Sequence, residues 1–257
     1  MKFYEVKIFI LSPHIDDAAY GLTVSISKWV KSDIPVTIIN CFTQTKWTIR
    51  FVSNDMQEIC KLRKQEDEEY NKFFNSCINI IHLDLLDAPL RNDYIFQYKP
   101  FERIEWEVVE ELKSYLQKNI PAGDILLCPL AIGDHIDHAI CREAVEQLYA
   151  GFNILFFEDL PYANRISEAQ ILSHAHDLGK RLKVELINNT NHFNECSINK
   201  EQAIRLYKTQ LNDEICAEII SHLNNLNGER LWGEAKVFEL LDKEVKCLKY
   251  NSNNKIA

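Results

Sequence analysis

The stretch KIFILSPHIDD, from Lys7 to Asp17, carries the strongest fold signal in the chain. Its first half, KIFILS, is a short apolar run without helical periodicity, which is typical of a buried strand in a parallel sheet. Residues 18–30 carry apolar side chains at helical intervals. His14 and Asp16 therefore lie in the turn where a strand passes into a helix, and ligands of parallel α/β sheets bind at this edge.

A second cluster, HIDH at residues 135–138, stands in the same context more than a hundred residues later. It follows the apolar run DILLCP, residues 124–129, which also predicts a buried strand. Residues 139–149, AICREAVEQLY, then predict a helix. Imidazole and carboxylate groups thus occur at a second turn that connects a predicted strand to a predicted helix.

The two clusters together predict one metal site assembled from two separate strand ends. His14 and Asp17, three residues apart, can point into a shared cavity, which leaves Asp16 to face whatever the metal holds. A catalytic zinc ion usually takes three protein ligands, so one histidine of the second cluster would complete the set. One neighbouring carboxylate then neutralises the cation while the other takes a proton from water. The remaining histidine is left for acid chemistry or for stabilising an oxyanion.

Each turn taken alone has a simpler interpretation. A carboxylate just before a helix, such as Asp16 or Asp17, can cap the helix N-terminus, with a nearby histidine bonded elsewhere. Two such turns, each after an apolar strand in a chain with only eight histidines, favour the divided metal site over two unrelated caps.

At these residues the chain resembles the LmbE/PIG-L-like family of zinc-dependent N-deacetylases. Residues 12–18, SPHIDDA, are similar to the S-P-H-L-D-D-A motif after the first strand of one branch of that family. Residues 133–138, GDHIDH, are similar to its later H-P-D-H motif. The resemblance covers about the first 165 residues well and the remainder loosely.

The resemblance implies a zinc site and a reaction. The implied metal ligands are His14, Asp17 and His138, with Asp16 as general base and His135 as the protonated partner of the tetrahedral intermediate. One zinc ion per chain is expected, and another divalent metal such as Fe²⁺ could replace it. The implied reaction is hydrolysis of a linear N-acyl amide, most often N-acetyl, on an amino sugar such as N-acetylglucosamine or on a metabolite that contains one.

Further segments match the family in order along the chain: RKQED at 63–67, LDAPLR at 86–91, EDLPY at 158–162 and RLYKTQ at 205–210. Taken singly, each could be an ordinary turn or a solvated charged helix. Candidates for supporting the ligands or contacting substrate are Asp137, Tyr20, Arg63, Asp87, Arg91 and His192. Tyr20 is expected to narrow the pocket near the first helix, and His192 to lie on a loop at its mouth.

The order of elements predicts an α/β fold with a Rossmann-like layered, mostly parallel sheet and helices on both faces. Strands are expected at 7–12, 35–42, 78–83, 124–129 and 153–157, with intervening helices at 18–30, 56–74, 101–118 and 139–149. After residue 164 the pattern changes, and it predicts helices at 166–178, 200–210 and 213–226, a strand at 181–188 and a strand or helix at 237–248. We expect one domain over 1–257, with a core at 1–164 and an α+β C-terminal subregion at 165–250 packed on it.

Composition excludes several other classes of protein. The net charge of −9 provides no basic surface for nucleic acid. No stretch approaches the length of a membrane span or has the pattern of a signal peptide, so we expect a soluble cytoplasmic protein that could form a homo-oligomer. The eight cysteines show no C-x-x-C spacing and are expected to be reduced thiols.

Two other functions stay open at this point. The chain could be a zinc amidase that acts on a non-sugar N-acyl compound or on a thiol conjugate, because zinc chemistry does not choose the acyl acceptor. It could also be a non-catalytic binding module on the same scaffold. Retention of every implied catalytic group argues against the binding module.

Overall fold

The computed structural model describes residues 6–91, 105–193 and 198–253, with side chains up to residue 245. Within these residues the centre of the fold is a seven-stranded sheet in the order β3-β2-β1-β4-β5-β7-β6. The first five strands in this order run parallel, and β7 and β6 are each antiparallel to their neighbour. The predicted mostly parallel α/β sheet is confirmed.

Strands and helices alternate in the first part of the chain, as the sequence predicts. In order they are β1 (Ile8–Ser12), α1 (Asp17–Lys31), β2 (Val36–Asn40), α2 (Met56–Phe73), β3 (Ile78–His82), α3 (Ala88–Arg91), α4 (Trp106–Asn119), β4 (Ile125–Pro129), α5 (Ile136–Glu146) and β5 (Asn153–Phe157). The helix expected from residue 101 is seen from Trp106, and residues 101–104 of that prediction lie outside the described residues.

The position of β1 in the sheet determines where a site can form. β2 pairs with one edge of β1 and β4 with the other, so the chain leaves β1 in one direction and returns on its opposite side. Such a reversal of strand order opens a crevice at the carboxyl ends of the strands. Every residue of β4 is buried, which explains its unbroken apolar sequence.

The second part of the chain differs from the prediction in several places. Its elements are α6 (Glu168–Leu182), β6 (Ile187–His192), α7 (Lys200–Ile204), α8 (Asp213–Leu226), β7 (Gly228–Gly233) and α9 (Ala235–Asn253). The strand expected at 181–188 is wrong, because α6 continues to Leu182 and ends on Lys183 in a left-handed conformation. The helix expected at 200–210 ends at Ile204, and the segment left open at 237–248 is helical.

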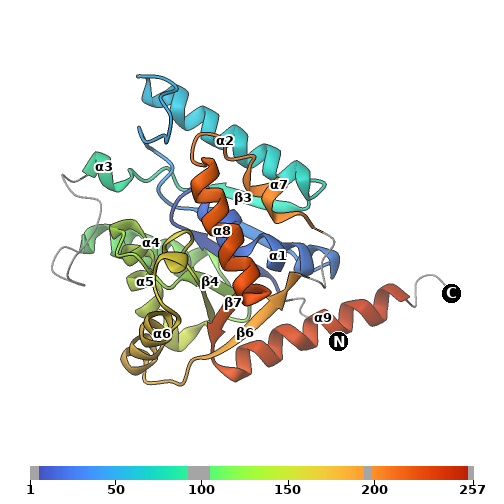
Figure 1. Cartoon of the computed structure of the whole chain (residues 1–257). Helices are drawn as coiled ribbons and strands as arrows, with labels where there is room; N and C mark the ends of the chain where they lie inside the picture. Colours follow the sequence, from blue (N-terminus) through green and yellow to red (C-terminus); the bar gives the residue numbers. More distant parts are fainter. Residues whose placement is uncertain (1–5, 92–104, 194–197, 254–257) are drawn as a thin grey trace.

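The helices pack around the sheet in two main groups. α1 lies against β1, β2 and β7 and packs with α7, while α8 lies against β7. α5 lies against β4 and packs with α4. Figure 1 shows α1 and α8 at the centre of the view, α4 and α5 together at the left, and α9 running out to the right.

A glycine in α1 allows this helix to approach the sheet closely. A Cβ atom on Gly21 would lie 2.8 Å from the ring of Phe157, the last residue of β5. α1 begins at the turn that carries His14, so the contact at Gly21 fixes that helix relative to β5.

None of the helices in the described part of the chain combines the length and the apolar character that crossing a bilayer requires. The cysteines at 41, 60, 77, 128, 141 and 216 are free thiols, as expected. Cys196 and the side chain of Cys247 lie outside the described residues.

Candidate metal centre and active site

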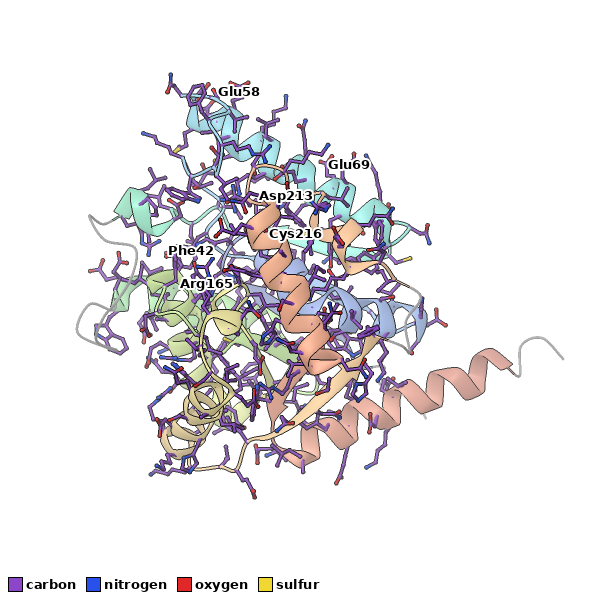
Figure 2. The ribbon with its side chains drawn as sticks, viewed as in Figure 1. Phe42, Glu58, Glu69, Arg165, Asp213 and Cys216 are labelled. Atoms are coloured by element: carbon purple, nitrogen blue, oxygen red, sulfur yellow. The ribbon has the colours of Figure 1, made fainter. Side chains whose placement is uncertain are left out.

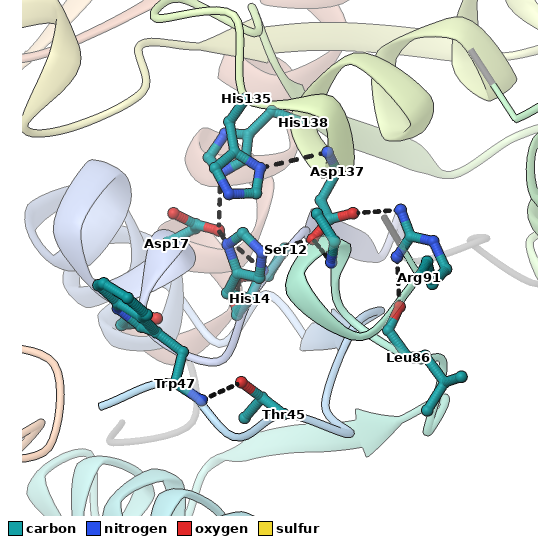
Figure 3. Close-up of polar contacts among 12 residues, drawn as sticks. Ser12, His14, Asp17, Thr45, Trp47, Leu86, Arg91, His135, Asp137 and His138 are labelled. Carbon is teal, nitrogen blue, oxygen red and sulfur yellow. Dashed lines mark hydrogen bonds and ion pairs between the residues drawn. The ribbon is translucent and has the colours of Figure 1, made fainter. Parts of the chain in front are cut away.

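The two predicted clusters meet at the carboxyl ends of β1 and β4 (Figure 3). These strands pair in parallel, so His14 after β1 and His135 and His138 after β4 come from adjacent strand ends. Donor atoms of the three histidines lie within 4.8 Å of one another. The expected joining of two distant sequence segments at one edge of the sheet is therefore seen.

Local hydrogen bonds hold the first turn in shape. The Ser12 hydroxyl donates to the carbonyl of His14 at 2.5 Å and accepts the backbone N–H of Ala18 at 3.0 Å. Asp17 Oδ2 accepts the backbone N–H of His14 at 2.7 Å. Asp16 precedes α1 but its side chain makes no capping hydrogen bond, so helix capping does not account for this carboxylate.

Asp17 lies between two histidines. Its Oδ2 atom is 3.2 Å from His14 Nδ1 and 3.3 Å from His138 Nε2 (Figure 3). Burial alone would raise the pKa of Asp17, but the two imidazoles hold it well below its usual value. One carboxylate and two histidines thus present their donor atoms toward a common point.

A second carboxylate stands behind each of these histidines. His14 Nε2 is 2.9 Å from Asp137 Oδ2, and His138 Nδ1 is 2.6 Å from Asp159 Oδ1. Histidines that bind metals usually donate their other ring N–H to a carboxylate or carbonyl in this way. Burial lowers the pKa of each histidine, but the adjacent carboxylates more than reverse this, raising the pKa of His14 to about 9 and that of His138 well above its usual value.

The two supporting carboxylates are themselves fixed. Asp137 Oδ2 accepts the backbone N–H of Ala88 at 3.0 Å, and its Oδ1 accepts from Arg91 Nη2 at 2.7 Å. Asp159 Oδ2 accepts the backbone N–H of Ile132 at 2.9 Å. Asp137 therefore lies beside His14, where its carboxylate can orient the imidazole.

Asp159 is absent from the candidates drawn from the sequence, although its segment EDLPY was noted. The missing signal is topological. Asp159 follows β5, and β5 is the neighbour of β4, so its carboxylate reaches His138 from the next strand along the sheet.

His135 has a different environment from the other two histidines. Its Nδ1 atom accepts the backbone N–H of Asp137 at 3.2 Å, which caps the N-terminus of α5. A ring that accepts at Nδ1 carries its proton on Nε2. Burial and the nearby His14 and His138 hold the pKa of His135 well below its usual value.

Asp16 faces the same cavity as Asp17 but has other partners. Its Oδ1 atom accepts from Arg63 Nη2 at 2.9 Å, and Arg63 lies buried on α2. Burial raises the pKa of Asp16 above its ordinary value, and Arg63 opposes this only in part. Two adjacent aspartates therefore differ sharply in how readily they hold a proton.

A cavity of about 250 Å³ opens beside these groups. Its inner wall contains Asp16, Asp17 and the three histidines, together with Tyr20, Arg63 and Asp87. The Tyr20 hydroxyl and Asp87 Oδ1 are buried there without a hydrogen-bond partner among the described residues. Tyr20 thus lines the cavity, as expected.

Further lining residues come from two other segments. They are Trp47 and Ile49 from the loop between β2 and α2, and Leu160, Tyr162 and Arg165 from the segment after β5. Arg165, labelled in Figure 2, lies near the centre of the molecule in that view. It pairs with Glu218 of α8 at 2.7 Å.

Two candidates lie away from the cavity wall. Arg91 contacts Asp137 and Glu105 and is not among the lining residues, so it holds the carboxylate that lies behind His14. His192 ends β6 at the far edge of the sheet, is exposed and has its Nδ1 atom 3.0 Å from the carbonyl of Asn227. His192 therefore does not lie at the cavity mouth, where the sequence placed it. Strands β5 and β7 separate β6 from β4.

Comparison with known proteins gives consistent matches. The chain is 25% identical over 234 residues to 2'-N-acetylparomamine deacetylase of Streptomyces fradiae. This alignment covers 84% of this chain and 77% of that protein. Among solved structures it is similar to the A40926 pseudoaglycone deacetylase Dbv21, with 21% identity and a TM-score of 0.63 over 89% of this chain and 97% of that one.

Two further solved structures share the fold. The zinc inhibited form of teicoplanin deacetylase Orf2 has 17% identity and a TM-score of 0.62, covering 88% of this chain and 97% of that one. N,N'-diacetylchitobiose deacetylase from Pyrococcus horikoshii has 17% identity and a TM-score of 0.52, covering 88% and 82%. Residues 9–149, more than half of the chain, match the family model described as PIG-L: GlcNAc-PI de-N-acetylase. With both sequence clusters inside the matched region, the chain belongs to the PIG-L family.

Proposed function

We propose that this protein is a zinc-dependent N-deacetylase that hydrolyses an N-acetyl amide on an amino sugar or on a metabolite containing one. The observation that carries the proposal is the group of His14, Asp17 and His138, with Asp137 and Asp159 bonded to the two imidazoles. Family membership and the deacetylase names of the similar proteins support it.

The donor set fits zinc. Ligands about 2.0–2.1 Å from a tetrahedral zinc ion stand about 3.3 Å from one another. The separations of Asp17 Oδ2 from the two imidazole nitrogens, 3.2 and 3.3 Å, agree with that value. His135 belongs to the same histidine cluster, but its Nδ1 atom is used to cap α5. We therefore propose His14, Asp17 and His138 as the ligands and zinc as the metal.

A zinc ion held by these residues would supply Lewis-acid chemistry, polarising the amide carbonyl and activating water. Asp16 then acts as general base and takes the proton of the attacking water, for which its raised pKa is well suited. His135, neutral and with its proton on Nε2, donates a hydrogen bond to the oxygen that gains charge as the amide carbon becomes tetrahedral. Asp16 returns its proton to the departing amine.

The inner wall also offers groups for the sugar. Asp87 Oδ1 and the Tyr20 hydroxyl are buried polar atoms that face the cavity, and leaving such atoms unpaired costs free energy. Hydroxyl groups beside the acetamido carbon of a sugar would satisfy them. Arg63 contacts Asp16, lines the same cavity and contributes further donors.

A panel of N-acetylated compounds tests the proposal directly. Zinc-loaded enzyme should release acetate from N-acetylglucosamine or a glycoside of it, and removal of zinc with a chelator should abolish this activity until zinc is added back. Preferential hydrolysis of acetylated amino acids or thiol conjugates would favour the amidase alternative. A cytoplasmic location and action on a small molecule without nucleic acid remain part of the proposal, and cell fractionation tests the location.

A further inference from the structure

A buried carboxylate next to Asp159 takes no part in the proposed reaction. Glu158 directly follows β5 and is 4% exposed. Its Oε1 atom accepts from Arg230 Nε at 2.5 Å and from Trp232 Nε1 at 2.9 Å. Its Oε2 atom lies 2.7 Å from His222 Nε2. Both oxygens of this side chain are therefore used, and their partners come from β7 and α8.

Glu158 continues the link between β5 and β7 beyond the end of the backbone pairing. The last pair of this antiparallel ladder is Phe157 with Leu231. The next residues in line are Glu158 and Arg230, and their side chains form an ion pair. Arg230 also donates from Nη1 and Nη2 to the two oxygens of Glu168, at 2.5 and 3.0 Å, at the start of α6. Side chains thus hold the chain in place where the sheet no longer does.

The side chains of Glu158 and Asp159 reach in two directions. Glu158 contacts β7 and α8, whereas Asp159 Oδ1 lies 2.6 Å from His138 Nδ1 at the candidate metal centre. One peptide bond joins the two residues. A shift of the backbone at Glu158 would therefore move the carboxylate behind His138.

Asp159 has little freedom to absorb such a shift. It is 1% exposed, and its other oxygen accepts the backbone N–H of Ile132 at 2.9 Å. A group that orients a metal ligand must stay within about 0.5 Å of its working position. Movement of the backbone would consequently weaken the bond of Asp159 to His138 or its bond to Ile132.

We propose that Glu158 is a positioning residue for metal binding. It fixes the chain after β5 against β7 and α8, so that Asp159 keeps its hydrogen bond to His138. This inference rests on the proposed function, because it concerns the metal centre of the same site. The simpler role, in which Glu158 only neutralises the buried charge of Arg230 and adds stability, is the alternative that the experiment must exclude.

Substitution by glutamine keeps the size of the side chain and removes its charge. Glu158→Gln should weaken zinc binding about threefold to tenfold, less than loss of a carboxylate that contacts a ligand directly, because it acts through Asp159. Competition with a chelator measures this affinity at a temperature where the variant is folded. The visible spectrum of the Co²⁺-loaded protein should also change, since it depends on the arrangement of the ligands.

A double-mutant cycle separates positioning from stability. If Glu158 acts through Asp159, Glu158→Gln should change zinc affinity much less in the Asp159→Asn background than in the wild-type background. An equal loss of affinity in both backgrounds would overturn the positioning role. A lowered melting temperature with unchanged zinc affinity would also overturn it and leave Glu158 with a purely structural role.

Two control variants complete the test. Glu168→Gln makes the same change at the other carboxylate that pairs with Arg230, and it should leave zinc affinity unchanged. Leu178→Ala opens a cavity beneath α6, so it should lower the melting temperature without altering zinc affinity or the Co²⁺ spectrum. If Leu178→Ala weakened zinc binding as much as Glu158→Gln does, lost stability would explain both effects and the proposal would fail.

These measurements do not depend on the reaction. A protein that binds zinc and hydrolyses no N-acetylated compound would refute the proposed function, while the cycle would still decide the role of Glu158. Release of acetate from N-acetylglucosamine together with equal losses of zinc affinity in the two backgrounds would retain the function and overturn the positioning role. Absence of zinc binding in the wild-type protein would overturn both.

Discussion

At the scale of single residues, the main feature is that the adjacent side chains of Asp16 and Asp17 lie in different electrostatic surroundings. Asp17 lies between two imidazoles, whereas the contact of Asp16 is with one arginine at the cavity wall. The pKa of Asp17 is held well below its usual value and that of Asp16 is raised by burial. When the surroundings give two neighbouring carboxyl groups different pKa values in this way, one group can act as acid or base while the other stays ionised.

The two aspartates can be separated by the same substitution at each position. Asp16→Asn should keep zinc and lose on the order of a hundredfold or more in kcat, since only the proton acceptor is removed. Asp17→Asn should lose zinc as well as activity. Elemental analysis and steady-state rates on both variants check this, and full zinc content in Asp17→Asn with depleted zinc in Asp16→Asn would reverse the two roles.

Asp159 offers a prediction that the sequence could not supply. Asp159→Asn removes the carboxylate behind His138 while keeping the size of the side chain, so zinc affinity should fall about tenfold to a hundredfold. Competition with a chelator measures this affinity. The control is Asp177→Asn, a change at an exposed carboxylate of α6, which should alter nothing. Unchanged affinity in Asp159→Asn would remove this carboxylate from the metal site.

At the scale of elements, apolar strands were predictable and polar ones were not. The runs at β1 and β4 are buried on both faces, so their sequences alone identify them and the clusters that follow. β6, with the sequence INNTNH, is an exposed edge strand and has the composition of a loop. β7, with the sequence GERLWG, is wholly buried, but Glu229 and Arg230 are satisfied by ion pairs that only the tertiary structure provides.

The residues of the candidate site also fall into those that the sequence predicts and those that it does not. Residues carried by the two clusters were predicted because each cluster is contiguous in sequence. The contact between Asp159 and His138 depends on β5 being adjacent to β4, and the outlying position of His192 depends on β6 lying at the sheet edge. Spatial order of strands is not encoded in any short stretch of sequence, so these two positions required the structure.

The contact between α1 and β5 can be tested with a single methyl group. Gly21→Ala places a Cβ atom 2.8 Å from the buried ring of Phe157, and such overpacking costs about 1–3 kcal/mol. The melting temperature should fall even though alanine favours helices over glycine by up to about 1 kcal/mol. Gly123→Ala, where no atom lies within 4 Å of the added Cβ, is the control and should be neutral. A melting temperature equal to that of the wild type in Gly21→Ala would mean that Phe157 moves aside freely.

At the scale of the whole molecule, the sheet runs through both parts of the chain. β7 pairs with β5, and its Glu229 reaches α1, where the carboxylate accepts the backbone N–H groups of Val24 and Ser25 at 2.9 and 2.8 Å. Lys200 of α7 pairs with the same carboxylate at 2.7 Å. The C-terminal subregion thus contacts the first helix as well as the sheet edge.

We therefore predict that residues 1–164 do not fold alone. That fragment would expose the edge of β5 and the face of α1 that α7 and β7 cover. It should show no cooperative thermal transition and should aggregate, while a control ending at residue 253 should melt like the full chain. A soluble 1–164 fragment with a sharp transition would divide the protein into two independent domains.

The contact of Glu229 with α1 also sets an order of events during synthesis. Both histidine clusters leave the ribosome well before Glu229 does, since they lie within the first 138 residues. Until β7 emerges, α1 lacks the carboxylate that accepts N–H groups near its middle, and β5, which precedes Asp159, lacks its outer neighbour. The nascent chain therefore contains all three proposed zinc ligands several seconds before β7 is synthesised. Only after that can the fold that positions these ligands be completed. We therefore expect metal loading at the proposed ligands to be a late event, which follows release of the last strand rather than appearance of the first histidine.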